Sequence, residues 1–433
     1  NLFTFASVNT TGFPIGKPKP HRPMKRFLLL LLALCPFALR AQPSDPAAVV
    51  LQPFIEQYAR ASEAARQGAC ARAEREYLRA IRTYEALSDT LRTNFEARNG
   101  DLLAGIYYNL ACVQSLQRKR AALGSLSAAI DHDYIRNNYT AYDWMLRDPD
   151  LSYLRGLDAF GPLKERAAAQ GDYLAILRAA APYDRTAPTD SLPRFRYAAP
   201  NNPDLVRVRT YFKLDSVAGS GDEVSQILNL MHWVHRTVRH DGSSANPVSR
   251  NAIDMVELCR SEDRGINCRM MAQMLNECYL ALGFRSRFVT CLPKEFVNDC
   301  HVICAVYSCT LDKWLWIDPT FDAYVTDEQG TPLGIGEVRE RMRDGRPYRL
   351  NPEANWNSEI PQTQEEYLDI YMAKNLYYMT CSDRSEFNTE TQYEGKQPLH
   401  YIGLVPPGYE NDTDQYDYAT TDDRWFWASP YAE

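Results

Sequence analysis

The stretch RGINCRMMAQM, residues 264–274, places a cysteine where a helix is expected to begin. Asn267 is a residue type that commonly caps helices, so the pattern puts Cys268 at the first helical position. There the positive end of the helix dipole and the unpaired N–H groups favour thiolate over thiol. Apolar residues recur at helical spacing as far as Leu282, and Gly283 stands where a helix would stop. Cys268 is therefore a candidate nucleophile; the alternative is a small buried core residue.

Two further polar residues follow in a segment that indicates antiparallel strands. RFVTC (287–291) is the first expected strand, and HVICAVYSC (301–309) and KWLWID (313–318) flank a tight turn. The second strand of a hairpin returns to the start of the first, so His301 and Asp318 are expected at one end of the sheet. Cysteine, histidine and aspartate can serve as nucleophile, base and orienting group.

The segments GINCRMMA, CHVICAVY and KWLWIDPT resemble the three signature blocks of the transglutaminase-like superfamily, over residues 204 to about 345. The resemblance implies a papain-like domain in which Cys268 is the nucleophile, His301 the general base and acid, and Asp318 the residue that orients the imidazole. It also implies an oxyanion donor from an upstream indole, for which Trp233 is the nearest candidate; the alternative is that Trp233 is a core residue of its helix. The implied activity is attack on an amide of a peptide or protein, through a thioester.

Hydrolysis of that thioester is favoured over crosslinking. Simple relatives in the superfamily resemble peptidases or amidases, and the calcium sites and extra β-domains of animal crosslinking members are not evident; DEQG (327–330) falls short of a calcium loop. No cofactor or metal is expected, because no ligand spacing accompanies His232, His235 and His240. The alternative function is a non-catalytic scaffold that binds peptides or glycans.

The segment MKRFLLLLLALCPFALRAQ has the layout of a secretory signal peptide, predicted over residues 24–41. Residues 1–23 are interpreted as sequence upstream of the natural start, and the protein is expected to be periplasmic or extracellular. Leu34 is larger than lipid attachment at Cys35 usually accepts, and the apolar run is too short to span a bilayer. We expect an exported protein that does not span the membrane.

Residues 47–180 predict a helical region in which two segments are similar, ARAEREYLRAI (71–81) and RAALGSLSAAI (120–130). The matching positions of the two segments, in order, are Ala73, Tyr77 and Ala80, and Ala122, Leu126 and Ala129. Small residues there let paired helices approach closely, which resembles the tetratricopeptide repeat. Such a region could bind a protein partner or act only as structural support.

The remaining boundaries follow from composition. A proline-bearing linker is predicted at residues 181–203, the transglutaminase-like domain at 204–350 and an aromatic-rich extension at 351–433. The predicted fold class is α+β, with an antiparallel sheet in the catalytic domain. The net charge of −7 is mild, and no basic stripe suggests a nucleic-acid partner.

Overall fold

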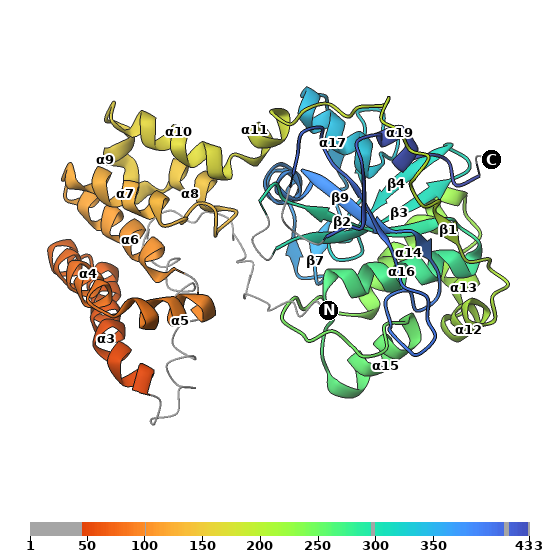
Figure 1. The fold of residues 1–433 in the computed structure, drawn as a ribbon, viewed down its shortest axis with the longest axis horizontal. Coiled ribbons are helices and arrows are strands. Elements are labelled where there is room, and N and C mark those ends of the chain that lie inside the picture. Colours follow the sequence, from red (N-terminus) through yellow and green to blue (C-terminus); the bar gives the residue numbers. More distant parts are fainter. Residues whose placement is uncertain (1–45, 100, 296–298, 411–414, 432–433) are drawn as a thin grey trace. The chain divides into compact units, whose positions relative to one another are not determined.

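The computed structural model describes residues 46–99, 101–295, 299–410 and 415–431. The predicted signal peptide at 24–41, the upstream segment 1–23 and Cys35 lie outside these residues. The described chain divides into two compact units between Asp172 and Tyr173 (Figure 1). The helical region predicted to end at residue 180 therefore ends eight residues earlier, and the next helix belongs to the second unit.

The first unit is helical throughout. Its elements are α3 (Pro46–Arg66), α4 (Cys70–Glu85), α5 (Asp89–Asn99), α6 (Leu102–Leu116), α7 (Ala121–Asp131), α8 (Ala141–Arg147), the 3-10 helix η1 (Pro149–Leu151), α9 (Ser152–Arg155) and α10 (Phe160–Gly171). Helix α3 packs on α4, and α6 packs on α7. The two similar segments form α4 and α7, and all six matching residues are buried. The prediction that they serve close helix packing is confirmed.

The second unit mixes helices and strands, which confirms the α+β class. Its elements before Cys268 are α11 (Tyr173–Arg178), β1 (Arg196–Tyr197), α12 (Pro203–Phe212), α13 (Leu214–Ala218), α14 (Glu223–Thr237) and α15 (Ala252–Glu262). The central elements are α16 (Cys268–Leu282), β2 (Ser286–Leu292), β3 (His301–Ser308), β4 (Lys313–Ile317), β5 (Val325–Thr326), α17 (Ile335–Asp344), β6 (Arg349–Leu350), β7 (Asn355–Trp356) and β8 (Ile360–Pro361). The last are the π-helix η2 (Glu365–Met372), α18 (Ala373–Asn375), β9 (Tyr378–Ser382), β10 (Arg384–Ser385), β11 (Tyr401–Leu404), β12 (Tyr418–Thr420) and α19 (Asp423–Phe426).

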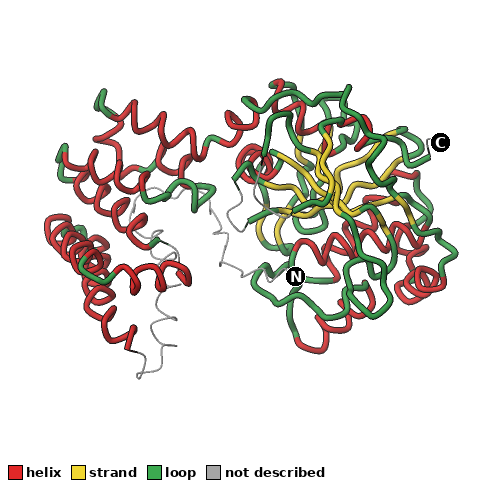
Figure 2. The backbone as a smooth tube through the Cα atoms, in the orientation of Figure 1, coloured by secondary structure: helices red, strands yellow, loops and turns green. Residues whose placement is uncertain are grey.

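One six-stranded sheet organises this unit, in the order β12-β11-β9-β2-β3-β4 (Figure 2). Its pairs are antiparallel except β11 with β12. The expected hairpin is β3–β4, and the expected preceding strand is β2, hydrogen-bonded to β3. Three of the six strands come from the segment after residue 350. The predicted boundary at residue 350 therefore cuts through one sheet, because sequence pattern alone does not reveal pairing between distant strands.

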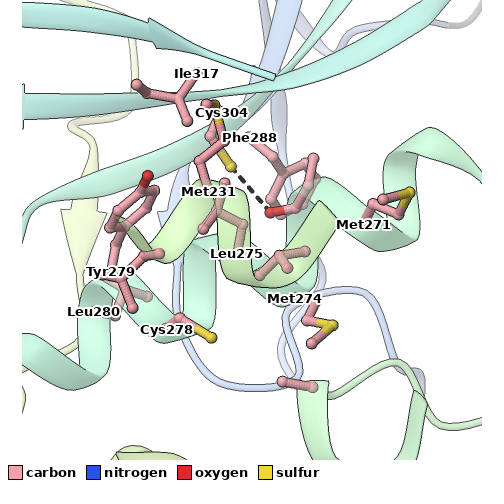
Figure 3. Packing of buried hydrophobic residues seen from close by; sticks show 14 of the residues in the cluster. Met231, Met271, Met274, Leu275, Cys278, Tyr279, Leu280, Phe288, Cys304 and Ile317 are labelled. Carbon is pink, nitrogen blue, oxygen red and sulfur yellow. Dashed lines mark hydrogen bonds between the residues drawn. The ribbon is translucent and has the colours of Figure 1, made fainter. Parts of the chain in front are cut away.

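Helix α16 crosses one face of the sheet and is buried along almost its whole length. Its apolar side chains pack with those of α12, α14 and α15 and with the facing residues of β2, β3 and β4. Figure 3 shows this core, in which the Cys304 thiol donates a hydrogen bond to the Ala272 carbonyl at 3.0 Å. A helix that is buried on nearly every side is held by its surroundings, so the position of residue 268 at its start is fixed by the core.

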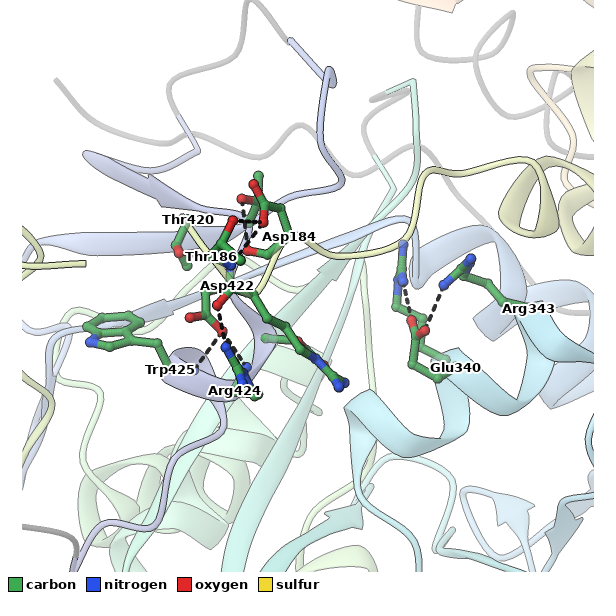
Figure 4. Close-up of polar contacts among 12 residues, drawn as sticks. Asp184, Thr186, Glu340, Arg343, Thr420, Asp422, Arg424 and Trp425 are labelled. Carbon is green, nitrogen blue, oxygen red and sulfur yellow. Dashed lines mark hydrogen bonds and ion pairs between the residues drawn. The ribbon is translucent and has the colours of Figure 1, made fainter. Parts of the chain in front are cut away.

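The opposite face of the sheet is covered by α17, η2 and α18, which contribute to a second core. Residues 181–203 run over this unit as part of it: Arg196 and Tyr197 pair with β10. Figure 4 shows the chain near its C-terminus, where Asp422 caps α19 by accepting hydrogen bonds from the backbone N–H groups of Arg424 and Trp425. This segment lies beside the one that carries Asp184, whose carbonyl accepts from the Thr421 hydroxyl. In the aromatic C-terminal segment, Phe426 is buried in the second core, and Trp425 and Trp427 pack against that core. Within the described ranges, no helix is both long enough and apolar enough to cross a membrane.

Candidate active site

Cys268 begins helix α16, as predicted. The Asn267 side chain accepts a hydrogen bond from the Met270 backbone at 3.1 Å, and the helix ends at Gly283, whose φ of +93° closes it in the left-handed region. The capping residue and the stop glycine that the sequence indicated are both confirmed. Cys268 is partly exposed as a residue, and it lies at the positive end of a 15-residue helix.

His301 and Asp318 meet at one end of the sheet. Ile303 stands across from Asp318 when the β3–β4 register is continued by one residue, and His301 lies two residues before Ile303, on the same face. The His301 Nε2 atom is 2.6 Å from Asp318 Oδ2, and both side chains are buried. The carboxylate accepts, so Nε2 carries a proton and Nδ1 is left to face the thiol.

The Asp318 carboxylate is fully engaged. Oδ2 also accepts from the Tyr367 hydroxyl at 2.6 Å, and Oδ1 accepts from the Thr320 backbone at 2.8 Å. The Tyr367 oxygen in turn accepts from the Trp316 indole at 3.3 Å. Tyr367 lies in the π-helix η2, a rare geometry that is common at functional sites. The helical spacing of this segment was visible in the sequence, but its contact with Asp318 was not.

Two aromatic rings flank the His301 imidazole. Phe321 and Tyr371 lie with ring centroids 5.5 Å and 5.4 Å from it, and His301 itself is 1% exposed. Water is therefore largely excluded from the His301–Asp318 pair, which strengthens their electrostatic interaction.

A second imidazole acts on the thiol. His240, like His301, lowers the pKa of Cys268. In the sequence His240 is one of three histidines without a metal-ligand spacing, and no role was predicted for it. The spacing between residues 240 and 268 in the sequence does not identify His240, because the two are brought together by the backbone bridge between His240 and Ile266.

Gly265 permits that approach. His240 and Ile266 form a parallel bridge, in which the Ile266 N–H donates to the Arg239 carbonyl at 3.0 Å. A Cβ atom at residue 265 would lie 2.7 Å from the same Arg239 oxygen, closer than real contacts allow. A glycine is therefore required for His240 to stand beside the chain two residues before Cys268.

The hairpin β7–β8 holds His240 from its other side. The Trp356 indole donates to His240 Nδ1 at 3.0 Å. The Asn357 side chain accepts from the His240 backbone N–H at 2.7 Å and donates to its carbonyl at 3.1 Å. Asn357 and Ser358, with φ of +54° and +60°, form the turn of this hairpin, and asparagine tolerates that conformation well.

The same hairpin reaches the other end of the site. Buried His235, on α14, has its Nδ1 3.0 Å from the Pro319 carbonyl and its Nε2 2.9 Å from Asn355 Oδ1. His235 thus ties the hairpin to the residue after Asp318. His232 is 2.6 Å from Asp322. No group of three or more candidate metal ligands occurs in the part of the chain that the structure describes.

Trp233, the candidate oxyanion donor, packs elsewhere. Its ring lies edge-on to Phe212 at 5.0 Å, and it borders the core beneath α16. This matches the alternative of a core residue.

The first turn of α16 is also anchored by charge. Arg269 donates to Glu390 at 2.6 Å and to the Thr290 hydroxyl at 2.8 Å. Glu390 is buried and additionally accepts from the Tyr401 hydroxyl at 2.9 Å. The residue next to Cys268 is thereby fixed by the segment after residue 350.

Cys268 and His301 shift each other's pKa in opposite directions. Burial alone would raise the pKa of the Cys268 thiol, but hydrogen bonds with His240 and His301, together with the charge of His301, lower it to about 6. Burial alone would lower the pKa of His301, but the charge and hydrogen bond of Asp318, aided by Cys268, raise it to about 10. Between these values a thiolate and an imidazolium coexist. Burial raises the pKa of the nearby thiols Cys291 and Cys300.

Comparisons with protein-family models, with curated proteins and with solved structures gave no match. The site offers a cysteine at a helix N-terminus, a buried imidazole oriented by a carboxylate, and a second imidazole held beside the start of the helix.

Proposed function

We propose that this protein is a cysteine enzyme that opens amide bonds through a thioester on Cys268, with water as the final acceptor. The observation that carries the proposal is the buried His301–Asp318 pair, with Nε2 2.6 Å from the carboxylate, together with a cysteine at the start of α16 whose pKa His301 lowers. A thiol with a lowered pKa, served by a base that a third group orients, is the arrangement of an activated nucleophile.

The first half of the reaction forms the thioester. The Cys268 thiolate attacks the carbonyl carbon, and the carbonyl π electrons move to the oxygen. The His301 imidazolium gives its Nδ1 proton to the amide nitrogen, the C–N bond breaks, and the amine leaves. Asp318 keeps the imidazole turned so that Nδ1 faces the sulfur and the leaving nitrogen.

The second half returns the enzyme to its starting state. Neutral His301 takes a proton from water, the hydroxide attacks the thioester carbon, and the C–S bond breaks to release a carboxylic acid and the thiolate. Hydrolysis is proposed over transfer because water needs no acceptor site of its own. Peptides and proteins are the proposed substrates on the strength of the motif resemblance.

The α+β architecture supports a papain-like arrangement for this domain. A buried helix that begins at the nucleophile packs on an antiparallel sheet whose adjacent strands supply the other two groups. Export is proposed from the apolar segment that follows Lys25 and Arg26 in the sequence.

A direct test uses p-nitrophenyl acetate as an acyl donor, with the acetylated cysteines mapped by mass spectrometry. The exposed Cys309 serves as an internal comparison thiol. We expect Cys268 to be acetylated at least about tenfold faster than Cys309. Hydrolysis of the acetyl thioester on Cys268 should follow. His301→Gln is expected to slow acetylation of Cys268 by about 10²-fold, the lower range for general acid–base catalysis.

Cys268→Ser is the matched control, because it keeps the shape of the side chain and removes the thiolate. Equal acetylation of Cys268 and Cys309 in the wild type would contradict the enzymatic proposal and favour the binding scaffold.

A further inference from the structure

Two imidazoles act on the Cys268 thiol, and the mechanism above uses one of them. The other, His240, is bridged to Ile266, two residues before Cys268. A base must offer a free nitrogen lone pair to the group it deprotonates. His301 does so, because its Nε2 proton goes to Asp318 and Nδ1 faces the thiol. His240 differs, because its second nitrogen is already engaged by a group that can only donate.

The tautomer of His240 follows from that contact. The Trp356 indole has a single N–H and no acceptor, and it lies 3.0 Å from His240 Nδ1. Nδ1 therefore accepts, and the ring proton resides on Nε2, the nitrogen left to face Cys268. An imidazole in this state donates a hydrogen bond toward the sulfur and cannot take the thiol's proton.

The position of the ring is fixed by backbone contacts as well. The bridge to Ile266 sets His240 beside the start of α16, and the Asn357 amide grips both its N–H and its carbonyl. A donor that is held in place before the reaction stabilises developing charge without reorganising.

We propose that His240 Nε2–H, together with the Cys268 backbone N–H, donates to the oxyanion of the tetrahedral intermediate, and that hairpin β7–β8 sets its tautomer and position. The oxyanion forms on the carbon that is attached to the sulfur, and the bridge to Ile266 holds His240 beside the start of the helix that carries this sulfur. The Cys268 N–H lies in the first turn of α16, where backbone N–H groups lack helical partners.

The assignment places an indole one step away from the reacting atoms. The sequence resemblance implied that an upstream indole would touch the oxyanion directly. In this chain the indole of Trp356 comes from downstream, fixes an imidazole by a hydrogen bond, and the imidazole acts on the nucleophile.

The inference rests on the proposed function, and its test separates two roles that His240 could have on the sulfur. Attack on a carbonyl creates an oxyanion, whereas alkylation by iodoacetamide displaces iodide and creates none. Both rates are measured on Cys268 of the full chain at about pH 9, where the thiolate prevails, with p-nitrophenyl acetate and iodoacetamide as the two probes.

We expect His240→Ala to slow acetylation of Cys268 about 10²-fold, the cost of losing one oxyanion donor, while alkylation changes less than about threefold. His240→Gln keeps an N–H at the same reach and is expected to restore acetylation at least about tenfold over alanine. Trp356→Phe, which removes only the indole N–H contact, is expected to lie between the wild type and His240→Ala. The control is His400→Ala, at a half-exposed histidine just before β11. It is expected to match the wild type.

Three other results would contradict the proposal. If acetylation and alkylation fall together in His240→Ala, and Trp356→Phe repeats this, His240 supports the thiolate and the oxyanion role is wrong. If neither rate falls, His240 does not act on the reaction. If wild-type Cys268 acetylates no faster than Cys309, the proposed function itself fails.

Discussion

The Asp318 carboxylate shows how a single residue is held for one task. It accepts from His301 and Tyr367 on one oxygen and from the Thr320 backbone on the other, and it is fully buried. A buried carboxylate is stable only when its lone pairs are used, and here each hydrogen bond also restricts its rotation. The fixed carboxylate in turn fixes the orientation of the His301 imidazole.

Tyr367→Phe is expected to destabilise the protein and to slow the reaction. The change removes the hydroxyl that donates to Asp318 and accepts from Trp316, so two buried groups lose a partner. We expect the free energy of unfolding to fall by about 1–3 kcal/mol and acetylation of Cys268 to slow severalfold. Urea unfolding measures the first effect.

Tyr393→Phe is the matched control, since Tyr393 is 61% exposed. Should Tyr367→Phe unfold at the same urea concentration as this control, the hydrogen bond to Asp318 would carry no stability.

The sequence identified Cys268, His301 and Asp318 because helix caps and hairpin ends are local signals. Asn267 and Gly283 mark the helix, and the pattern of apolar residues marks both strands. His240 and Tyr367 could not be found in this way. Their places depend on contacts between segments more than twenty residues apart, and sequence periodicity carries no information on such contacts.

At the scale of elements, the hairpin β7–β8 acts as a clamp on the loop after α14. It has two residues in each strand, and it contacts the site through Trp356 and Asn357 at His240 and through Asn355 at His235. Residues 355–361 lie in the predicted aromatic-rich extension, and no separate role was predicted for them. Their importance comes from their hydrogen bonds with the two histidines.

Gly265→Ala is expected to impair the site without changing any of its side chains. The added Cβ would meet the Arg239 carbonyl at 2.7 Å and force apart the backbone bridge that places His240. We expect a loss of about 1–3 kcal/mol in stability and slower acetylation of Cys268. Gly124→Ala is the control, because its added Cβ would meet no atom within 4 Å. Equal acetylation rates in the two variants would show that the bridge does not position His240.

At the scale of the whole molecule, the unit that holds the candidate site extends from Tyr173 to the described C-terminal residues. Strands β9, β11 and β12 complete the sheet beyond β2, and Glu390 and Tyr401 anchor Arg269 beside the nucleophile. The predicted domain at 204–350 would leave β2 without its β9 partner. Composition changes after residue 350, which suggested a boundary, but pairing across more than eighty residues overrides it.

Two truncations test this boundary. A chain of residues 173–433 is expected to fold and to retain fast acetylation of Cys268, whereas residues 173–350 lack three strands and Tyr367 and are expected not to fold. Circular dichroism and urea unfolding distinguish the two. Cooperative unfolding of the shorter chain would show that the later strands are an appendage and not part of the sheet's stability.

The helical unit, residues 46–172, buries its repeat-like positions among its own helices. Its similarity to a tetratricopeptide pair stays a prediction, as does its role as a support or as a binding surface for a partner.

The central claim is that Cys268 and His301 exist as a thiolate–imidazolium pair. The most direct measurement is the rate of iodoacetamide alkylation of Cys268 against pH, with Cys309 read in the same sample. Because the pKa of Cys268 is lowered to about 6 and that of His301 raised to about 10, the rate should rise through about pH 6 and stay high through neutrality. In His301→Ala the imidazolium is lost and burial prevails, so the rise should move up by at least about one pH unit. If Cys268 alkylates at about pH 6 no faster than Cys309, or if the variant follows the wild-type curve, the pair does not exist and the catalytic account is wrong.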